Sequence, residues 1–184
     1  MARVMSNAEL CPNCGTRLIA PRGKPSEILI AGEFPGYMEI NMGVPWVGEA
    51  GDVLEKELNR VGLSLNACRS TNLWLHKIPD DAPSKKAEFD FHFKRLLEEI
   101  GQAKYILLCG SELGPLMFGH KISTINGLGY KKLDKSATID WLKKGQVAVA
   151  SYNPAVCLNT EGVVGDFRFA IERFGEIVKK GKKK

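Results

Sequence analysis

The chain has 184 residues and a net charge of +5, with 26 lysines and arginines against 21 aspartates and glutamates. This length suits one domain that buries its core without disulfides, and neither an 18-residue apolar run nor a signal-peptide pattern occurs, which argues against a membrane or secreted protein. We therefore expect a soluble, cytoplasmic, monomeric protein with a single domain over residues 1–178.

The first feature along the chain is a pair of cysteines. Cys11 and Cys14 form the C-x-x-C knuckle of "CPNCG", and an odd total of five cysteines in a cytoplasmic chain indicates metal binding or core packing instead of a disulfide framework. Cys68, Cys109 and Cys157 are scattered. We expect these three to pack in the core, because free cysteine is among the most buried residue types.

Short apolar segments then alternate with amphipathic ones. The expected strands cover residues 28–32, part of 69–75, 105–110 and 147–151, and the expected helices cover 47–61, 89–100 and 167–178. This order predicts an α/β fold, a three-layer α/β/α sandwich around a mainly parallel, four-stranded sheet. The final residues, 179–184, read "KKGKKK" and predict a disordered basic tail, which serves solubility or attracts nucleic acid without specificity.

A long glycine-rich loop follows the first strand. Residues 32–51 read "GEFPGYMEINMGVPWVGEAG", with five glycines and two prolines. A plain strand-to-helix connection needs only a few residues, so a loop of this length is functional or disordered. Its many apolar side chains argue against a solvated linker. Because ligands of such folds bind beyond the carboxyl ends of the strands, we expect the loop to form part of a binding site.

This loop carries a resemblance to a known family. It is similar, without a gap, to the first motif of the uracil-DNA glycosylase superfamily, and most closely to family 4, whose members contain a metal cluster. The resemblance continues through "STNLWLHKIPDD" and ends at "SYNPAVCL", so it covers the chain from Cys11 to about Leu158. It implies a DNA glycosylase that flips uracil, or a related deaminated or 5-modified pyrimidine, out of DNA and hydrolyses its N-glycosidic bond during base excision repair.

The resemblance implies how the extruded base is held. Gly32 and Gly36 would let main-chain amides approach the nucleotide, whereas they are otherwise plain turn residues. Trp46 replaces the family phenylalanine that stacks on the base, with a core tryptophan as the alternative. Asn72 matches the asparagine that reads the Watson–Crick edge of uracil. Outside the family, a strand-end asparagine is more often a cap or turn residue.

Acidic residues of the same motif suggest the chemistry. Glu33 and Glu39 match family carboxylates that, near the sugar, orient the attacking water and stabilise the positive charge of an oxocarbenium-like transition state. Phe34 departs from the family, which has a small residue there, or the water-activating aspartate in the branch with fast chemistry. Either Phe34 reshapes the pocket, or Glu33, Glu39 and Asp81 manage the water.

The last motif also departs from family 4. Asn153 replaces a histidine that donates to the base O2, and "NPA" resembles the N-P-S motif of the mismatch-specific branch. A neutral amide donor predicts slower chemistry than histidine provides. Val156, Cys157 and Leu158 would enter the minor groove, with Leu158 as the preferred apolar wedge. The alternative for these three residues is ordinary packing.

The metal ligands of family 4 are also altered. The family holds an iron–sulfur cluster with C-x-x-C and two later cysteines, and those two positions are His76 and His92 here, sixteen residues apart as in the family. Together with Cys11 and Cys14, they make a Cys₂His₂ set within residues 11–92 that suits Zn²⁺. Rieske-type ligation leaves an iron–sulfur cluster open. The alternative is two surface histidines beside a lone C-x-x-C.

Two further functions remain open at the level of the sequence. One is a non-catalytic, accessory DNA-binding module, which Phe34 and Asn153 favour because both replace residues used in catalysis. The other is an enzyme that uses the same pocket for a different reaction on a modified pyrimidine.

Overall fold

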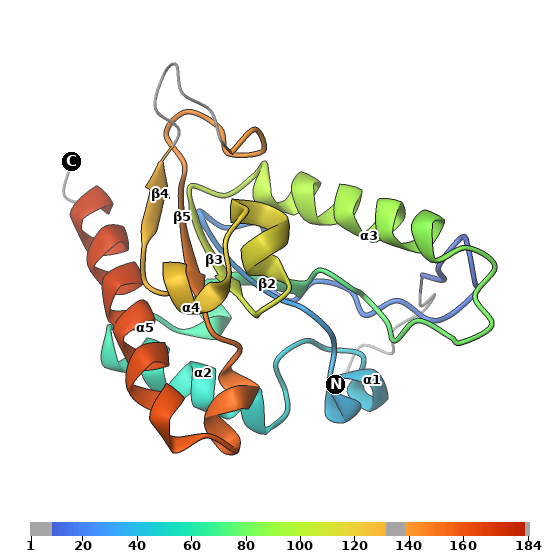
Figure 1. Ribbon diagram of the computed structural model, residues 1–184, viewed down its shortest axis with the longest axis horizontal. Helices are drawn as coiled ribbons and strands as arrows, with labels where there is room; N and C mark the ends of the chain where they lie inside the picture. Colours follow the sequence, from blue (N-terminus) through green and yellow to red (C-terminus); the bar gives the residue numbers. More distant parts are fainter. Residues whose placement is uncertain (1–8, 132–138, 183–184) are drawn as a thin grey trace.

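A five-stranded sheet forms the centre of the computed structural model, which describes residues 9–131 and 139–182 (Figure 1). Its strands are β1 (Ile28–Gly32), β2 (Arg69–Asn72), β3 (Tyr105–Cys109), β4 (Gly129–Lys131) and β5 (Val147–Ser151), in the order β2-β1-β3-β5-β4. The first three and β5 are parallel, as predicted. The predicted number of four strands is wrong, because β4 pairs antiparallel with β5 at one edge.

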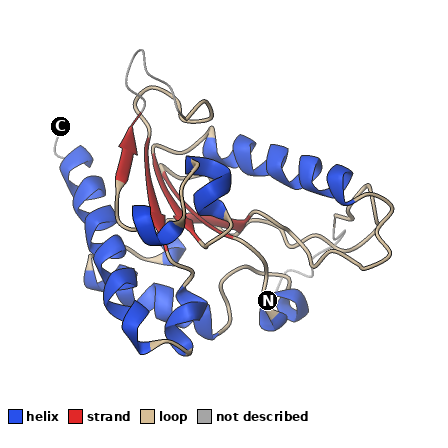
Figure 2. Cartoon of the chain, in the orientation of Figure 1, coloured by secondary structure: helices blue, strands red, loops and turns tan. Residues whose placement is uncertain are grey.

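Helices cover both faces of this sheet and confirm the three-layer α/β/α sandwich (Figure 2). One layer consists of α2 (Glu49–Arg60) and α5 (Glu161–Lys182), and the other contains α3 (Lys85–Ile100), η2 (Gly114–Phe118) and α4 (Ile122–Ile125). Strands β1, β3 and β5 are buried along their whole length. Their sequences are therefore continuous apolar runs instead of alternating patterns.

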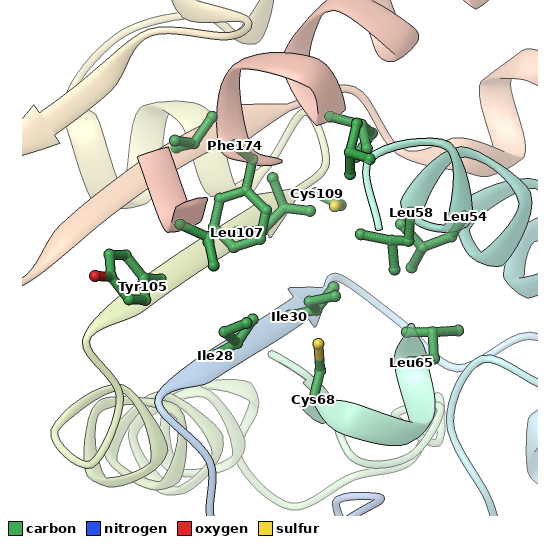
Figure 3. Packing of buried hydrophobic residues seen from close by; sticks show 14 of the residues in the cluster. Ile28, Ile30, Leu54, Leu58, Leu65, Cys68, Tyr105, Leu107, Cys109 and Phe174 are labelled. Atoms are coloured by element: carbon green, nitrogen blue, oxygen red, sulfur yellow. The ribbon is translucent and has the colours of Figure 1, made fainter. Parts of the chain in front are cut away.

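The core beneath α2 and α5 is seen from close by in Figure 3. Ile30 and Leu107 of the sheet face Leu54 of α2 and Phe174 of α5. The alternate strand residues, such as Leu29 and Leu108, point to the opposite face and pack beneath α3, η2 and α4. Full burial of such a side chain contributes about 1.5–3 kcal/mol, so the two apolar layers fix the sheet firmly between them.

The prediction that the scattered cysteines belong to the core is confirmed for Cys68 and Cys109, whereas Cys157 is only partly buried. Cys68 and Cys109 are buried within the cluster of Figure 3, and Cys157 packs against it. Within the described ranges, no helix is both long and apolar enough to cross a membrane.

Helix α5 extends further than the sequence indicates. The apolar stripe predicted a helix over 167–178 followed by disorder, but α5 continues through Lys182. Gly181 lets this end approach the core, because a Cβ there would lie 1.8 Å from the hydroxyl oxygen of Tyr105. Lysines at a helix carboxyl end also interact favourably with the helix dipole. The tail prediction is therefore wrong for residues 179–182, and residues 183–184 lie outside the described part.

Candidate active site and metal centre

The parallel sheet places the predicted site residues at one edge. In the order β2-β1-β3, the chain leaves β1 toward β2 on one side and later returns as β3 on the other. Loops diverge at such a switch point, and the crevice between them is the usual ligand site of an open α/β sheet. Glu33 directly follows β1, Asn72 ends β2, and Asn153 follows β5.

A buried carboxylate lies at the centre of this edge. Glu33 is 9% exposed, and its Oε2 accepts a hydrogen bond of 3.3 Å from Nδ2 of Asn153. Its Oε1 accepts from the main-chain N–H of Glu112, in the loop after β3. Gly110 makes room for it: its φ is +146°, and a Cβ there would lie 2.1 Å from the carboxyl carbon of Glu33. The loops after β1, β3 and β5 thus converge on one anionic group.

Two residues of this arrangement escaped the sequence analysis. Gly110 ends the predicted third strand and Glu112 follows it, where glycine and a polar residue are expected of any turn. Burial, together with the charge of Glu33, raises the pKa of the Glu112 carboxyl above its ordinary value. Only the three-dimensional contact with Glu33 distinguishes these residues from ordinary turn residues.

The Asn153 amide is held in one orientation. Its Oδ1 accepts 3.0 Å from the main-chain N–H of Ala155 and so caps η3 (Pro154–Leu158). The Nδ2 group therefore faces Glu33. Nδ2 carries two hydrogens, and Glu33 is its one acceptor among the described residues. The second hydrogen is therefore available to a ligand. Asn153 can thus join a carboxylate to a substrate oxygen.

Asn72 lies in close contact with Gly32 and Trp46. It is 5% exposed, yet its side-chain amide makes no hydrogen bond to any other described residue. A Cβ on Gly32 would lie 2.6 Å from Oδ1 of Asn72 and 2.7 Å from Cζ2 of Trp46, so only glycine fits there. The amide atoms of Asn72 are not among the fully buried, unpaired side-chain atoms of the described residues, so they reach the surface of the site. Its free donor and acceptor are therefore available to a ligand.

Trp46 belongs to both the core and this site. It is 8% exposed, it is part of the apolar cluster beneath α2 and α5, and its ring edge faces Gly32. Its φ of +60° is unusual for a residue other than glycine, and a Cβ at Gly51 would lie 2.3 Å from its carbonyl oxygen. Trp46 is therefore a core residue. Stacking of its ring on an extruded base is a separate proposal, which rests on the position of the ring edge beside Gly32.

Phe34 is turned toward the opposite layer of the sandwich. Its ring is 44% exposed and stacks on Trp74, with centroids 5.7 Å apart and planes inclined by 10°. Trp74 in turn contacts Phe89 of α3. The position that carries a water-activating aspartate in the fast branch thus holds an aromatic ring packed on another ring. This arrangement leaves Glu33 as the carboxylate at the centre of the edge.

Glu39 closes the glycine-rich loop on itself. It lies in α1 (Tyr37–Met42), is 7% exposed, and its Oε1 accepts from the main-chain N–H groups of Val47 and Gly48, both at 2.9 Å. Gly48 is the N-cap of α2, so a carboxylate here also suits the helix dipole. Gly36 provides the space, because a Cβ there would lie 2.6 Å from Oε2 of Glu39. Glu39 thus holds the loop, and no described hydrogen bond links it to Glu33 or Asn153.

This geometry predicts a stability effect for Glu39→Gln. The substitution removes the negative charge from two main-chain donors, and charge-assisted bonds of this kind contribute about 1.5–3 kcal/mol each. We expect the free energy of unfolding in urea to fall by about 1–3 kcal/mol. Glu98→Gln, at an exposed site on α3, is the matched control and should change it by less than about 0.5 kcal/mol. Equal effects of the two variants would contradict the assigned role.

Leu158 and Asp81 lie at the periphery. A hollow of about 520 Å³ lies between α1, the start of α2 and Leu158, and Leu158 is 44% exposed at its border. An exposed leucine beside this hollow is compatible with an apolar wedge. Asp81 is exposed in the loop between β2 and α3, and within the described residues no hydrogen bond joins it to Glu33, Asn72 or Asn153.

The predicted metal ligands come together at the amino-terminal half of α3. Cys11 and Cys14 of the knuckle lie beside His76, from the segment after β2, and His92 of α3. The side chains that place one ligand atom each within 4.8 Å of one another are those of Cys11, Cys14, His76 and Glu88. Glu88 was missed by the sequence analysis, although its spacing of four residues from His92 puts both on one helix face.

The two histidines differ in their hydrogen bonds. Nδ1 of His76 lies 2.9 Å from the carbonyl oxygen of Lys77, and its Nε2 lies 3.6 Å from Sγ of Cys14. His92 uses Nδ1 to accept 3.4 Å from the main-chain N–H of Leu75, and its Nε2 lies 3.1 Å from Nε2 of His76. Burial, reinforced by the nearby His76, lowers the pKa of His92 to about 4, so this ring is neutral near pH 7.

The electrostatics of this group favour a cation. Glu88 is fully buried, Oε2 accepts 3.1 Å from Sγ of Cys11, and Oε1 has no hydrogen-bond partner. Burial alone would raise the pKa of Glu88, but hydrogen bonds from Cys14 and Cys11 and the adjacent histidines lower it. Burial also raises the pKa of the Cys11 thiol to about 11. A bound cation would stabilise the thiolate and the carboxylate together.

Two comparisons with known proteins match most of the chain. The family model described as "Uracil DNA glycosylase superfamily" matches residues 21–172. A curated type-4 uracil-DNA glycosylase from Pyrobaculum aerophilum is 24% identical over 182 residues, covering 93% of this chain and 89% of the relative. The range matched by the family model includes Glu33, Asn72 and Asn153, whereas it begins after the Cys11–Cys14 knuckle.

Proposed function

Because the chain belongs to the uracil DNA glycosylase superfamily, we propose that it is a monofunctional DNA glycosylase that removes uracil, or a related deaminated or 5-modified pyrimidine, from DNA. The reaction is hydrolysis of the N-glycosidic bond, and the product is an abasic site for base excision repair. The relative from Pyrobaculum aerophilum supports uracil as the base. In this proposal the protein acts as a monomer in the cytoplasm.

The observation that carries the proposal is the contact between Glu33 and Asn153 near Asn72, whose amide makes no hydrogen bond to another described residue. These residues come from three different strands, and all of them lie at or just beyond the carboxyl ends of those strands, at one edge of the parallel sheet. The anion of Glu33 suits a developing sugar cation, and the fixed amide donor of Asn153 suits a departing base. The amide of Asn72 suits the edge of a pyrimidine.

Asn72 would select the base. Its amide has a donor for O4 and an acceptor for N3–H of uracil, whereas cytosine presents a donor amine and an unprotonated N3. Oδ1 of Asn72 and the ring edge of Trp46 both lie against Gly32, where a Cβ would come within 2.7 Å of each. Trp46 would support the base with its ring, and Gly32 and Gly36 would let the main chain come close to the nucleotide.

Glu33 and Asn153 would divide the chemistry. As the bond between N1 and C1′ breaks, positive charge grows on the sugar and negative charge on the base. Glu33 would stabilise the sugar, orient the attacking water and accept its proton. Asn153 would donate its remaining amide hydrogen to O2 of the leaving base. Glu39 would act indirectly by holding the loop, and Leu158 would fill the gap left by the extruded base.

The proposal also includes a structural metal, with zinc as the expected ion and an iron–sulfur cluster as the alternative. The group of Cys11, Cys14, His76 and Glu88 contains soft thiolates and an imidazole, which zinc favours. When bound, the ion would tie the knuckle to α3 and to the segment after β2. None of its ligands belongs to the catalytic set proposed above.

A single-turnover assay tests the function. Duplex and single-stranded oligonucleotides with one uracil are incubated with excess protein, and abasic sites are cleaved with alkali. We expect cleavage at uracil and none at thymine or cytosine in otherwise identical strands. Absence of cleavage, combined with preserved binding to the same DNA, would instead favour a non-catalytic module. Loss of a 5-modified pyrimidine without abasic sites would favour a different reaction.

A further inference from the structure

The size of the cage around the cysteine knuckle limits what it can hold. Sγ of Cys11 lies 3.1 Å from Oε2 of Glu88, Oε2 lies 3.3 Å from Nε2 of His76, and that nitrogen lies 3.6 Å from Sγ of Cys14. Around a tetrahedral zinc ion, with bonds of about 2.0–2.3 Å, neighbouring ligand atoms lie roughly 3.3–3.8 Å apart. The observed separations therefore match one small ion.

The same cage does not fit an iron–sulfur cluster. Such clusters are held by four thiolates, or by two cysteines on one iron and two histidines on the other. All five cysteines of this chain are described, and Cys68, Cys109 and Cys157 lie in or against the apolar cluster of Figure 3. With the donor atoms of the knuckle, His76 and Glu88 all within 4.8 Å of one another, several irons and sulfides have no room between them.

The hydrogen bonds of the two histidines identify which of them faces an ion. Nδ1 of His76 faces a main-chain carbonyl oxygen, so Nδ1 carries the proton. Nε2 of His76 is then unprotonated, and its lone pair can bind a metal ion. His92 accepts a main-chain N–H on Nδ1, so its proton must be on Nε2. A protonated Nε2 cannot bind a metal. It can instead donate to Nε2 of His76, 3.1 Å away, when no ion is bound there, and to Oε2 of Glu88, 3.5 Å away, when one is.

Glu88, unlike His92, presents an unprotonated atom to the ion site. It is fully buried on the first turn of α3, and Oε2 contacts both Cys11 and His76. Its other oxygen, Oε1, is buried without a hydrogen-bond partner. A carboxylate in this condition is stable only beside a compensating charge, and the thiol and imidazoles around it supply none when they are neutral.

From these observations we propose that the knuckle binds one Zn²⁺ through Cys11, Cys14, His76 and Glu88, in place of an iron–sulfur cluster, and that His92 is a positioning residue for Glu88. The four ligands come from the N-terminal knuckle, the segment after β2 and helix α3. The ion thus joins three segments that the small apolar cluster of Cys11, Leu18 and Leu75 also brings together. This proposal does not depend on glycosylase activity.

Metal analysis and X-ray absorption of the purified wild-type protein test the ligand set. We expect about one zinc per chain, no stoichiometric iron or sulfide, and a zinc shell of two sulfurs and two nitrogen or oxygen atoms with one imidazole. Two imidazoles in that shell would overturn the assignment of Glu88. Iron with sulfide, or no bound metal, would overturn the zinc site itself.

A matched pair of variants separates ligand from positioning residue. Glu88→Gln keeps the shape and removes the anionic oxygen, whereas His92→Asn keeps an acceptor near the Leu75 amide and removes Nε2. We expect Glu88→Gln to be isolated with far less than one zinc per chain. His92→Asn should retain one zinc with a single imidazole, and its affinity in chelator competition should fall by about 10–100-fold, as for other outer-shell partners. Loss of zinc from His92→Asn, or full retention by Glu88→Gln, would contradict the proposal. If Glu88→Gln does not fold, the imidazole count of the wild type decides.

Discussion

Replacing Asn72 by aspartate is expected to abolish uracil excision while the protein remains folded. The aspartate is nearly isosteric, but at neutral pH it presents two acceptors where the amide had one donor and one acceptor. Uracil O4 would then face a carboxylate instead of an N–H group. A site that pairs with a substrate group discriminates by 10⁴–10⁵-fold when that pairing is lost, so we expect the single-turnover rate on uracil to fall by about 10⁴-fold.

The base dependence of this variant is as informative as its rate. A carboxylate can accept from the cytosine amine, so a trace of cytosine excision is expected beside the loss on uracil. Asn59→Asp, the same change at an exposed position of α2, should leave both rates unchanged. We would measure uracil, 5-hydroxymethyluracil and cytosine in identical strands. A uniform loss on all three bases would show that Asn72 does not read the pyrimidine edge.

The second large effect is expected from Glu33→Gln. The substitution preserves the volume over Gly110 but removes the charge opposite the developing sugar cation. Loss of one such electrostatic contact costs about 10²–10³-fold in the chemical step. We therefore expect the single-turnover excision rate to fall by at least 100-fold, with binding to abasic DNA changed much less.

Asn153→Ala provides a test of the contact between the two residues. On its own it should lower the rate by at least about tenfold, because one donor to the base O2 is lost. Since Nδ2 of Asn153 lies 3.3 Å from Oε2 of Glu33, the effects should be less than additive in the double variant. Strict additivity would mean that the two groups act independently, and wild-type rates in both single variants would refute their catalytic roles.

The long apolar strands made the fold predictable from the sequence. Residues of β1, β3 and β5 are buried on both faces, so their sequences identify them without alternation. Gly129–Lys131 forms a three-residue antiparallel edge with one apolar partner strand, and such a short segment has no periodic pattern to detect. The end of α5 was missed because its lysines suggest solvation, whereas contact of Gly181 with Tyr105 depends on tertiary packing.

The sequence motifs predicted the individual residues of the candidate site but not the contacts between them. Glu33, Asn72 and Asn153 each end or follow a strand, so parallel topology places them at one edge. The sequence could not show that Glu39 is engaged by main-chain donors, because that depends on the course of the loop. Glu88 was hidden for a similar reason. Its neighbours Phe89 and Phe93 define the apolar stripe of α3, and an acidic residue before them reads as a solvated first-turn residue.

The pairing of Glu33 with Asn153 has a consequence for how the protein becomes active. These residues are 120 positions apart, and in the fold they are brought together by the pairing of β5 with β3 and of β3 with β1. Parallel pairings between distant segments form slowly, whereas the helices of a folding chain appear early. During refolding, helical circular dichroism should therefore recover before excision activity does. An active molecule is one in which the last strand of the parallel sheet is already in register.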